Sequence, residues 1–232
     1  MFYQDSIENR LRFGDVLKGF LSTAPSLAKP LDEQAKDPYR IDVSIPDFSV
    51  IIDPCCEIGG GTLSLTPLIH VKATLWDTPS LFEDITRINR KAMPKDLMHP
   101  VQWNELTDAE KKDIMSVTPD YGHTTFFIYE SNAQFSPYTV KATKYEEVVD
   151  PVTKLPKYNR QGPTEFTTRH YMLNFKNIYH VNCEKISDPR KTIDDSIQRS
   201  IVLQLSKKTR NELREKMADY FGEIPEEDIT EM

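Results

Sequence analysis

Two adjacent cysteines, Cys55 and Cys56, are followed by the acid Glu57 in a turn that could carry chemistry. A cysteine attacks as its thiolate, which nearby cations or N–H donors favour by lowering the thiol pKa. The amides of the glycine triplet at 59–61 could supply such donors if they curl into a nest. We therefore take Cys56 and Glu57 as candidate catalytic residues. The alternative is that both thiols fill a core beside a turn, and that the glycines only permit positive φ.

A metal site is the second chemistry to weigh. His180 and Cys183 could join Cys55 or Cys56 as soft zinc ligands. Residues three apart on a strand face opposite sides, however, and the chain has no C-x2-C pair. We therefore expect no metal and no cofactor. The other histidines are explained as surface or packing residues, although one of them, at a strand start, could act as a general base. They are His70, His99, His170 and the strand-start residue His123.

Two clusters of basic side chains could meet a nucleic-acid backbone or an acidic partner. The first consists of Arg87, Arg90, Lys91 and Lys95, and the second of Lys207, Lys208, Arg210 and Arg214. A solvated helix face is the alternative for each cluster. The net charge of −7 does not favour a general electrostatic grip on nucleic acid. A protein partner or a homo-oligomer therefore stays open.

The chain shows no signal for a membrane. No run reaches the roughly 18 apolar residues that a membrane helix needs. Residues 1–9 carry two acids and no apolar core, so they do not resemble a signal peptide. We therefore expect a cytoplasmic protein with free thiols.

Short apolar or alternating segments predict strands around the candidate site. We expect them at 13–20, 41–45, 49–52, 63–71, 124–129 and 171–181, the last divided by a turn near 176–177. A polar loop is expected from Ser22 to Arg40. The polar, proline-bearing stretch from Tyr138 to Thr168 predicts either a long exposed β-hairpin or a mobile loop.

Helices are predicted in two places. Residues 77–120 form a mostly helical insertion, in which Leu81, Ile85 and Ile88 share one helical face that should be buried on the barrel or on a partner subunit. Within it, Thr107 and Glu110 form a capping box that begins a short helix.

The second helix is expected at 206–221, capped by Ser206 or Thr209 and stopped by Gly222. Its apolar stripe should comprise Leu213, Met217 and Phe221. Residues 223–232 should form an acidic tail.

These elements predict an α+β fold built as an SH3-like small β-barrel with a helical insertion and a C-terminal helix. We expect a single domain over 1–222. The barrel would take residues 10–76 and 121–205, the insertion 77–120, the last helix 206–221 and the tail 223–232.

The order of these signals resembles the PemK/MazF-like group of SH3-like barrels. The resemblance rests on Gly14-Asp15-Val16, on the strand at 49–52, on Leu65-Thr66-Pro67-Leu68-Ile69 and on the last helix. A nearer likeness is to uncharacterised bacterial proteins with a Ser-Gln-Thr-Cys-Asp-Ile turn. Its place is taken here by Asp53-Pro54-Cys55-Cys56-Glu57-Ile58, in which Cys56-Glu57-Ile58 stands for Cys-Asp-Ile. The resemblance implies a bacterial protein associated with toxin–antitoxin or defence systems.

The chain departs from MazF-type ribonucleases. Those enzymes resemble one another in an arginine after a strand and a threonine just beyond the proline of the third strand. Here Thr66 precedes Pro67, and no arginine lies between Ile41 and Arg87. The leading hypothesis is therefore a binding or accessory protein. The alternative is a divergent endoribonuclease or a thiol-dependent hydrolase that uses Cys56 and Glu57, so enzymatic activity stays open.

Overall fold

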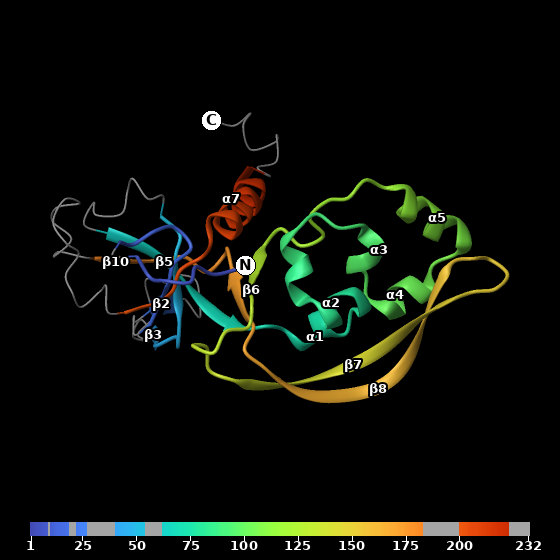
Figure 1. The fold of residues 1–232 in the computed structure, drawn as a ribbon, viewed down its shortest axis with the longest axis horizontal. Helices are drawn as coiled ribbons and strands as arrows, with labels where there is room; N and C mark the ends of the chain where they lie inside the picture. Colours follow the sequence, from blue (N-terminus) through green and yellow to red (C-terminus); the bar gives the residue numbers. More distant parts are fainter. Residues whose placement is uncertain (9, 19–21, 27–39, 54–61, 183–199, 223–232) are drawn as a thin grey trace, which may run out of the picture. The chain divides into compact units, whose positions relative to one another are not determined.

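The computed structural model of the chain shows an α+β fold (Figure 1) and describes residues 1–8, 10–18, 22–26, 40–53, 62–182 and 200–222. The chain divides into two compact units. Unit 1 comprises Met1–Ile69 and Asn174–Arg210, and unit 2 comprises His70–Leu173 and Asn211–Met232. The boundary falls within the last helix. The single domain expected over 1–222 stays a prediction.

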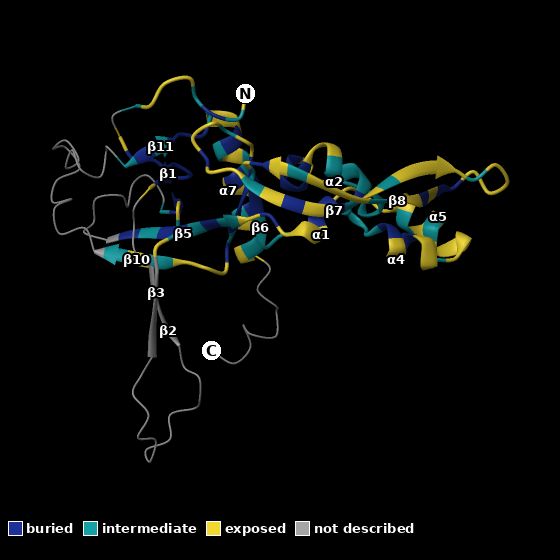
Figure 2. Cartoon of the chain, turned by 90° about the horizontal axis from the view of Figure 1, so that it is seen from below, coloured by how far each residue is buried: buried dark blue, intermediate teal, exposed yellow. Residues whose placement is uncertain are grey.

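Unit 1 is built from antiparallel strands. The order β11-β1-β4-β5 joins β11 (Ile201–Leu203), β1 (Val16–Leu17), β4 (Ser49–Ile51) and β5 (Thr62–His70), and β10 (Tyr179–Asn182) also pairs with β5. Strand β1 is buried throughout (Figure 2). Within the described segments this order joins neighbouring strands without closing a ring, so the SH3-like barrel also stays a prediction.

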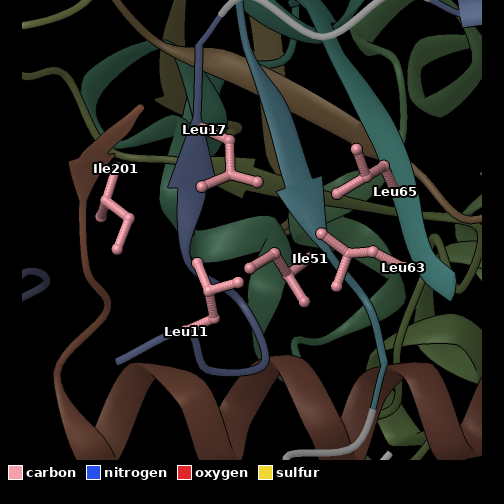
Figure 3. Packing of buried hydrophobic residues seen from close by; sticks show 6 residues of the cluster. All are labelled: Leu11, Leu17, Ile51, Leu63, Leu65 and Ile201. Carbon is pink, nitrogen blue, oxygen red and sulfur yellow. The ribbon is translucent and has the colours of Figure 1, made fainter. Parts of the chain in front are cut away.

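Alternation along these strands places their large apolar side chains in one cluster (Figure 3). Leu63 and Leu65 of β5 share this cluster with Leu17 and Ile51, and all four lack exposed surface. Each such side chain contributes about 1.5–3 kcal/mol when fully buried. The cluster therefore fixes the register of β1, β4 and β5.

Two expectations for unit 1 are wrong in part. The strand expected over 13–20 is only Val16–Leu17 where it is described, because Gly14 turns the chain with a φ of 85°. The loop expected from Ser22 to Arg40 begins with a strand, β2 (Ser22–Ser26), that pairs with β3 (Arg40–Ser44) in a separate two-stranded sheet. Pro25 is compatible with β2 because each strand of such a pair has an outer edge that needs no donor.

Unit 2 contains a series of short helices, three of which begin at a proline. These are α2 (Pro79–Glu83), α3 (Pro94–Leu97) and α4 (Pro100–Glu105), preceded by α1 (Ala73–Trp76) and followed by α5 (Asp108–Ser116). Proline suits the first helical position because its fixed φ is helical and its missing N–H would have no partner there. The mostly helical character expected for 77–120 is confirmed, as is the capping box of α5.

The continuous helix expected around 81–88 is interrupted at Asp84. The side chain of Asp84 accepts from the backbone N–H of Thr86 and so ends α2 and begins the 3-10 helix η1 (Ile85–Asn89). Leu81, Ile85 and Ile88 are nevertheless all buried, as expected.

The strands of unit 2 are β6 (Phe126–Tyr129) with its neighbour β9 (Tyr171–Asn174), and the hairpin of β7 (Tyr138–Val149) and β8 (Pro156–Thr168). The hairpin confirms the first of the two alternatives for 138–168. Among the described strands, the two pair only with each other. In Figure 1 the hairpin runs beside the helices of this unit.

The last helix, α7, spans Lys207–Gly222. Ser206 caps it, since its Oγ accepts from the N–H of Thr209 at 3.3 Å. The expected stripe is only partly correct: Leu213 is fully buried, but Phe221 is 45% exposed. Lys216, which was not expected in the stripe, is fully buried. Among the described residues, no helix has both the length and the apolar character that crossing a bilayer requires.

Candidate functional site

The thiol site lies outside the described residues. This holds for Cys55, Cys56, Glu57, the glycine triplet and Cys183. Their expected roles therefore stay predictions. The described residue nearest to the turn in the chain is Asp53, whose carboxylate accepts from the backbone N–H of Ser64.

The histidines that are described make packing contacts or hydrogen bonds. His70 stacks on Tyr138 with 3.9 Å between ring centroids, and His123 stacks on Phe126 at 5.1 Å. His180 shares a 2.9 Å hydrogen bond with the hydroxyl of Ser64. Within the described residues, no group of three His, Cys, Asp or Glu side chains could hold a metal ion.

His170 and His99 also take part in local contacts. Nδ1 of His170 lies 2.8 Å from the Thr168 hydroxyl, and burial lowers the pKa of His170. His99 accepts from the N–H of Val101 and so caps α4. His170 therefore lies beside a hydroxyl, and His99 beside a backbone amide.

A cleft of about 640 Å³ lies in unit 2 between α2, η1 and α3 on one side and the β-hairpin on the other. We call it the hairpin cleft. Four acids and two bases line it: Glu83, Asp96, Glu146, Glu147, Arg87 and Lys144. Pro79, Ser80, Tyr145 and Gln161 complete the lining. Apolar side chains dominate most small-molecule sites, so this lining favours a polar, charged ligand.

A second hollow of about 340 Å³, the basic hollow, shares Ser80, Arg87 and Asp96 with the hairpin cleft. Arg90 and Lys91 also line it. Three members of the first basic cluster therefore face one hollow. The two hollows together present an acidic half and a basic half.

Several charges in these hollows already have partners. Lys95 Nζ lies 3.3 Å from Glu147 Oε1, and Glu147 Oε2 accepts from the Tyr158 hydroxyl at 3.0 Å. Lys91 Nζ lies 3.8 Å from Asp120 Oδ1. Within the described part of the chain, the exposed side chains of Arg87 and Arg90 form no ion pair. Together with Lys144, an exposed lysine of the hairpin cleft, they are the cations available to an incoming anionic group.

The second basic cluster is spread along α7. Lys207, Lys208 and Arg214 are exposed, and Arg210 is half-buried with Nη2 3.4 Å from the carbonyl of Leu205. Their spread along one helix favours the solvated helix face over a binding site for this cluster.

The most unusual ionisable group of unit 2 is Lys216, whose side chain has no exposed surface. Its ammonium donates to the carbonyl of Ile88 and lies over the rings of Tyr121 and Phe126, 5.4 and 5.9 Å from their centroids. Burial lowers the pKa of Lys216 to about 7, although the Asp219 carboxylate opposes the shift. Burial, with Lys216 as the second cause, also lowers the pKa of His123.

A second buried ionisable group, Asp15, lies in unit 1. Its Oδ2 accepts from the N–H of Arg12 at 2.9 Å and from Gln204 Nε2 at 2.7 Å. Burial raises the pKa of Asp15 to about 7, although the Arg12 guanidinium 3.7 Å away opposes the shift. Arg12 also donates to Glu8 and Gln4. The network joins the N-terminal segment to Gln204 and has a structural role.

No protein-family model matches the chain, and neither a curated protein nor a solved structure does. The likeness to the PemK/MazF-like group therefore stays a prediction. The hairpin cleft, found by geometry, is the best-supported candidate site.

The sequence reasoning found Arg87, Arg90 and Lys91 but missed the acidic half of the cleft. Glu146 and Glu147 lie on β7, about 60 positions further along the chain, and only the folded hairpin brings them to α2 and α3. Lys216 could have been found, since it shares one helix face with Thr209 and Leu213 by the i, i+4, i+7 spacing.

Proposed function

We propose that this chain is a binding module that takes a charged segment of a partner polypeptide into the hairpin cleft. The observation that carries the proposal is the paired arrangement of an acidic cleft and a basic hollow that share Arg87 and Asp96. A partner segment with a basic residue beside an acidic one would match both halves. Its charges would also fix the register and the direction of binding.

Other ligand classes match the cleft less well. A nucleic-acid backbone needs several cations in a row, whereas four acids and two bases line the hairpin cleft. A small apolar ligand would leave these charged side chains without partners. The polypeptide segment is therefore the class that the lining favours.

The resemblance to the PemK/MazF-like group supports placing this binding role in a bacterial, cytoplasmic accessory protein of a toxin–antitoxin or defence system. Catalysis by Cys56 and Glu57 stays a separate prediction. Thiol labelling of the native protein tests it: fast labelling of Cys56 alone would support a reactive site, and slow labelling of both Cys55 and Cys56 would oppose it.

A peptide selection tests the binding proposal. Random linear 12-residue peptides displayed on phage are selected on the full chain, and the affinity of synthetic binders is measured by fluorescence anisotropy. We expect peptides that combine basic and acidic residues. Their affinity should fall tenfold or more in a Glu83→Lys, Glu146→Lys double variant, because both substitutions reverse charges that line the cleft.

The matched control is Glu165→Lys, which reverses an exposed acid of β8 that does not line the cleft. Its affinity for the same peptides should stay within twofold of the wild-type value. The proposal is overturned if no peptide is selected, or if charge reversal in the cleft has no more effect than the control.

A further inference from the structure

As far as the chain is described, the β-hairpin leaves one strand edge open where it borders the cleft. At Thr143 of β7 the backbone N–H points away from β8 and donates to the carboxylate of Asp77, beside α1. The outer edge of β7 therefore faces the helices. Four consecutive residues further along the same strand, 144–147, line the hairpin cleft.

The register identifies the backbone groups that point outward beyond Thr143. Tyr158 of β8, opposite Glu147, exchanges its N–H and C=O with the side-chain amide of Asn104 rather than with β7. In an antiparallel ladder this marks a non-hydrogen-bonded pair, whose two members both point their backbone groups outward. Glu147 thus presents its N–H and C=O to the outside.

The period of two extends this conclusion to neighbours of Glu147. Tyr145, opposite Arg160, and Val149, opposite Pro156, also form non-hydrogen-bonded pairs. Among the described residues, the outward N–H and C=O groups of Tyr145, Glu147 and Val149 have no hydrogen-bond partner. The open edge is about 13 Å long, which is five residues of extended chain.

We propose that the segment bound in the hairpin cleft is extended and adds as a strand to this outer edge of β7. The inference rests on the proposed binding function and specifies how the partner is held. Backbone hydrogen bonds to Tyr145, Glu147 and Val149 would supply affinity for any extended segment. Side chains that alternate toward the cleft would meet Glu83 and Arg87 and supply specificity.

The charge of the edge argues against a second copy of this chain as the occupant. Pairing of β7 with another β7 around a twofold axis would bring Glu146 and Glu147 of both copies close together. Like charges directly opposite each other destabilise a strand pair. A different polypeptide with basic residues at these positions therefore suits the edge better.

The experiment uses the peptides selected on the full chain and removes one backbone donor at a time. Glu147→Pro deletes the outward N–H, whereas Glu147→Ala removes the same carboxylate and keeps the N–H. We expect Glu147→Pro to bind at least fivefold more weakly than Glu147→Ala, since one hydrogen bond is lost. Glu165→Pro, at an outward-facing position of β8 outside the cleft, should bind like wild type.

A second measurement does not depend on the folding of any variant. N-methylation of single peptide bonds in the selected peptide should weaken binding at alternate positions only, because every second N–H of an added strand faces β7. The strand-addition proposal is overturned if neither the proline variant nor N-methylation has a position-dependent effect while the cleft charge reversal still abolishes binding. If the charge reversal in the cleft also has no effect, the binding function is overturned as well. The strand-addition proposal would also be overturned if two copies of this chain pair through this edge. Such pairing would be detected as a dimer that Glu147→Pro dissociates.

Discussion

Replacing Lys216 with methionine tests the energetic cost of its burial. The folded pKa of about 7 lies below the ordinary lysine value of 10.5, so between these two values the unfolded chain binds more protons than the folded chain. The free energy of unfolding therefore rises with pH across this window. Methionine has a similar length and does not titrate, so the stability of Lys216→Met should lack this rise with pH.

The magnitude follows from the proton difference. Between pH 7 and pH 9 the unfolded lysine keeps its proton, while the folded one goes from about half to almost fully deprotonated. At 1.36 kcal/mol per proton and pH unit, wild-type stability should gain about 2 kcal/mol relative to Lys216→Met. At pH 7 itself the variant gains from the removed burial cost but leaves the Ile88 carbonyl without its donor, which costs about 1–3 kcal/mol.

Urea unfolding followed by tryptophan fluorescence suits this test. The chain has two tryptophans, Trp76 and Trp103, and both are buried in unit 2 with Lys216. The control is Lys208→Met, at an exposed lysine of the same helix. His123 titrates below the window, because its pKa is lowered from 6.5; the pKa of Tyr121 is raised by burial, so Tyr121 titrates above it. A stability difference between wild type and Lys216→Met that does not change from pH 7 to pH 9 would refute the reasoning.

Three further predictions concern single contacts. Asn89→Leu should lower the stability of unit 2 by roughly 2–4 kcal/mol in the same unfolding assay, because the buried N–H and C=O of Ile128 each lose a 2.7 Å hydrogen bond. An equal loss of stability on Asn104→Leu, at an exposed asparagine, would contradict this. Gly122→Ala should cost about 1–3 kcal/mol, since the new Cβ would lie 2.1 Å from Leu97 Cδ1; an unchanged urea midpoint would show that Leu97 moves freely. Wild-type stability should decrease between pH 5 and pH 7, because the raised pKa of Asp15 keeps the folded carboxyl protonated where the unfolded one is ionised, and Asp15→Asn should remove this decrease. Amide exchange at Ile51 measures the stability at each pH. The same pH dependence in both proteins would contradict the prediction.

Local signals in the sequence were sufficient for most of the elements. The capping box at Thr107 and Glu110 needs only neighbouring residues, and it forms as expected. The apolar spacing of Leu81, Ile85 and Ile88 correctly predicted burial, although Asp84 divides the helix. Burial follows from composition and period, whereas a break depends on which backbone group a short polar side chain bonds.

The parts that could not be predicted depend on contacts between distant residues. Nothing near Glu146 indicates that it will face Glu83, because their proximity arises from the docking of the hairpin beside α2. The expected stripe of α7 assumed that every apolar residue at the right spacing is buried, yet Lys216 is buried and Phe221 is exposed. A lysine is buried only where an acceptor and aromatic ring faces can contact its ammonium. For Lys216 these come from η1, β6 and Tyr121.

Two asparagines show why the open edge of β7 is informative. Asn89 exchanges two hydrogen bonds with Ile128 of β6, and Asn104 does the same with Tyr158 of β8. A side-chain amide can present an N–H and a C=O side by side, as a peptide group does, so each asparagine occupies an edge position that another strand could otherwise take. On β7 the carboxylate of Asp77 occupies Thr143 in a similar way. The chain thus covers strand edges at three places beside its helices, and the β7 edge next to the charged cleft lacks such a cover among the residues described. An edge left open beside a charged cleft is the arrangement that strand addition by a partner requires.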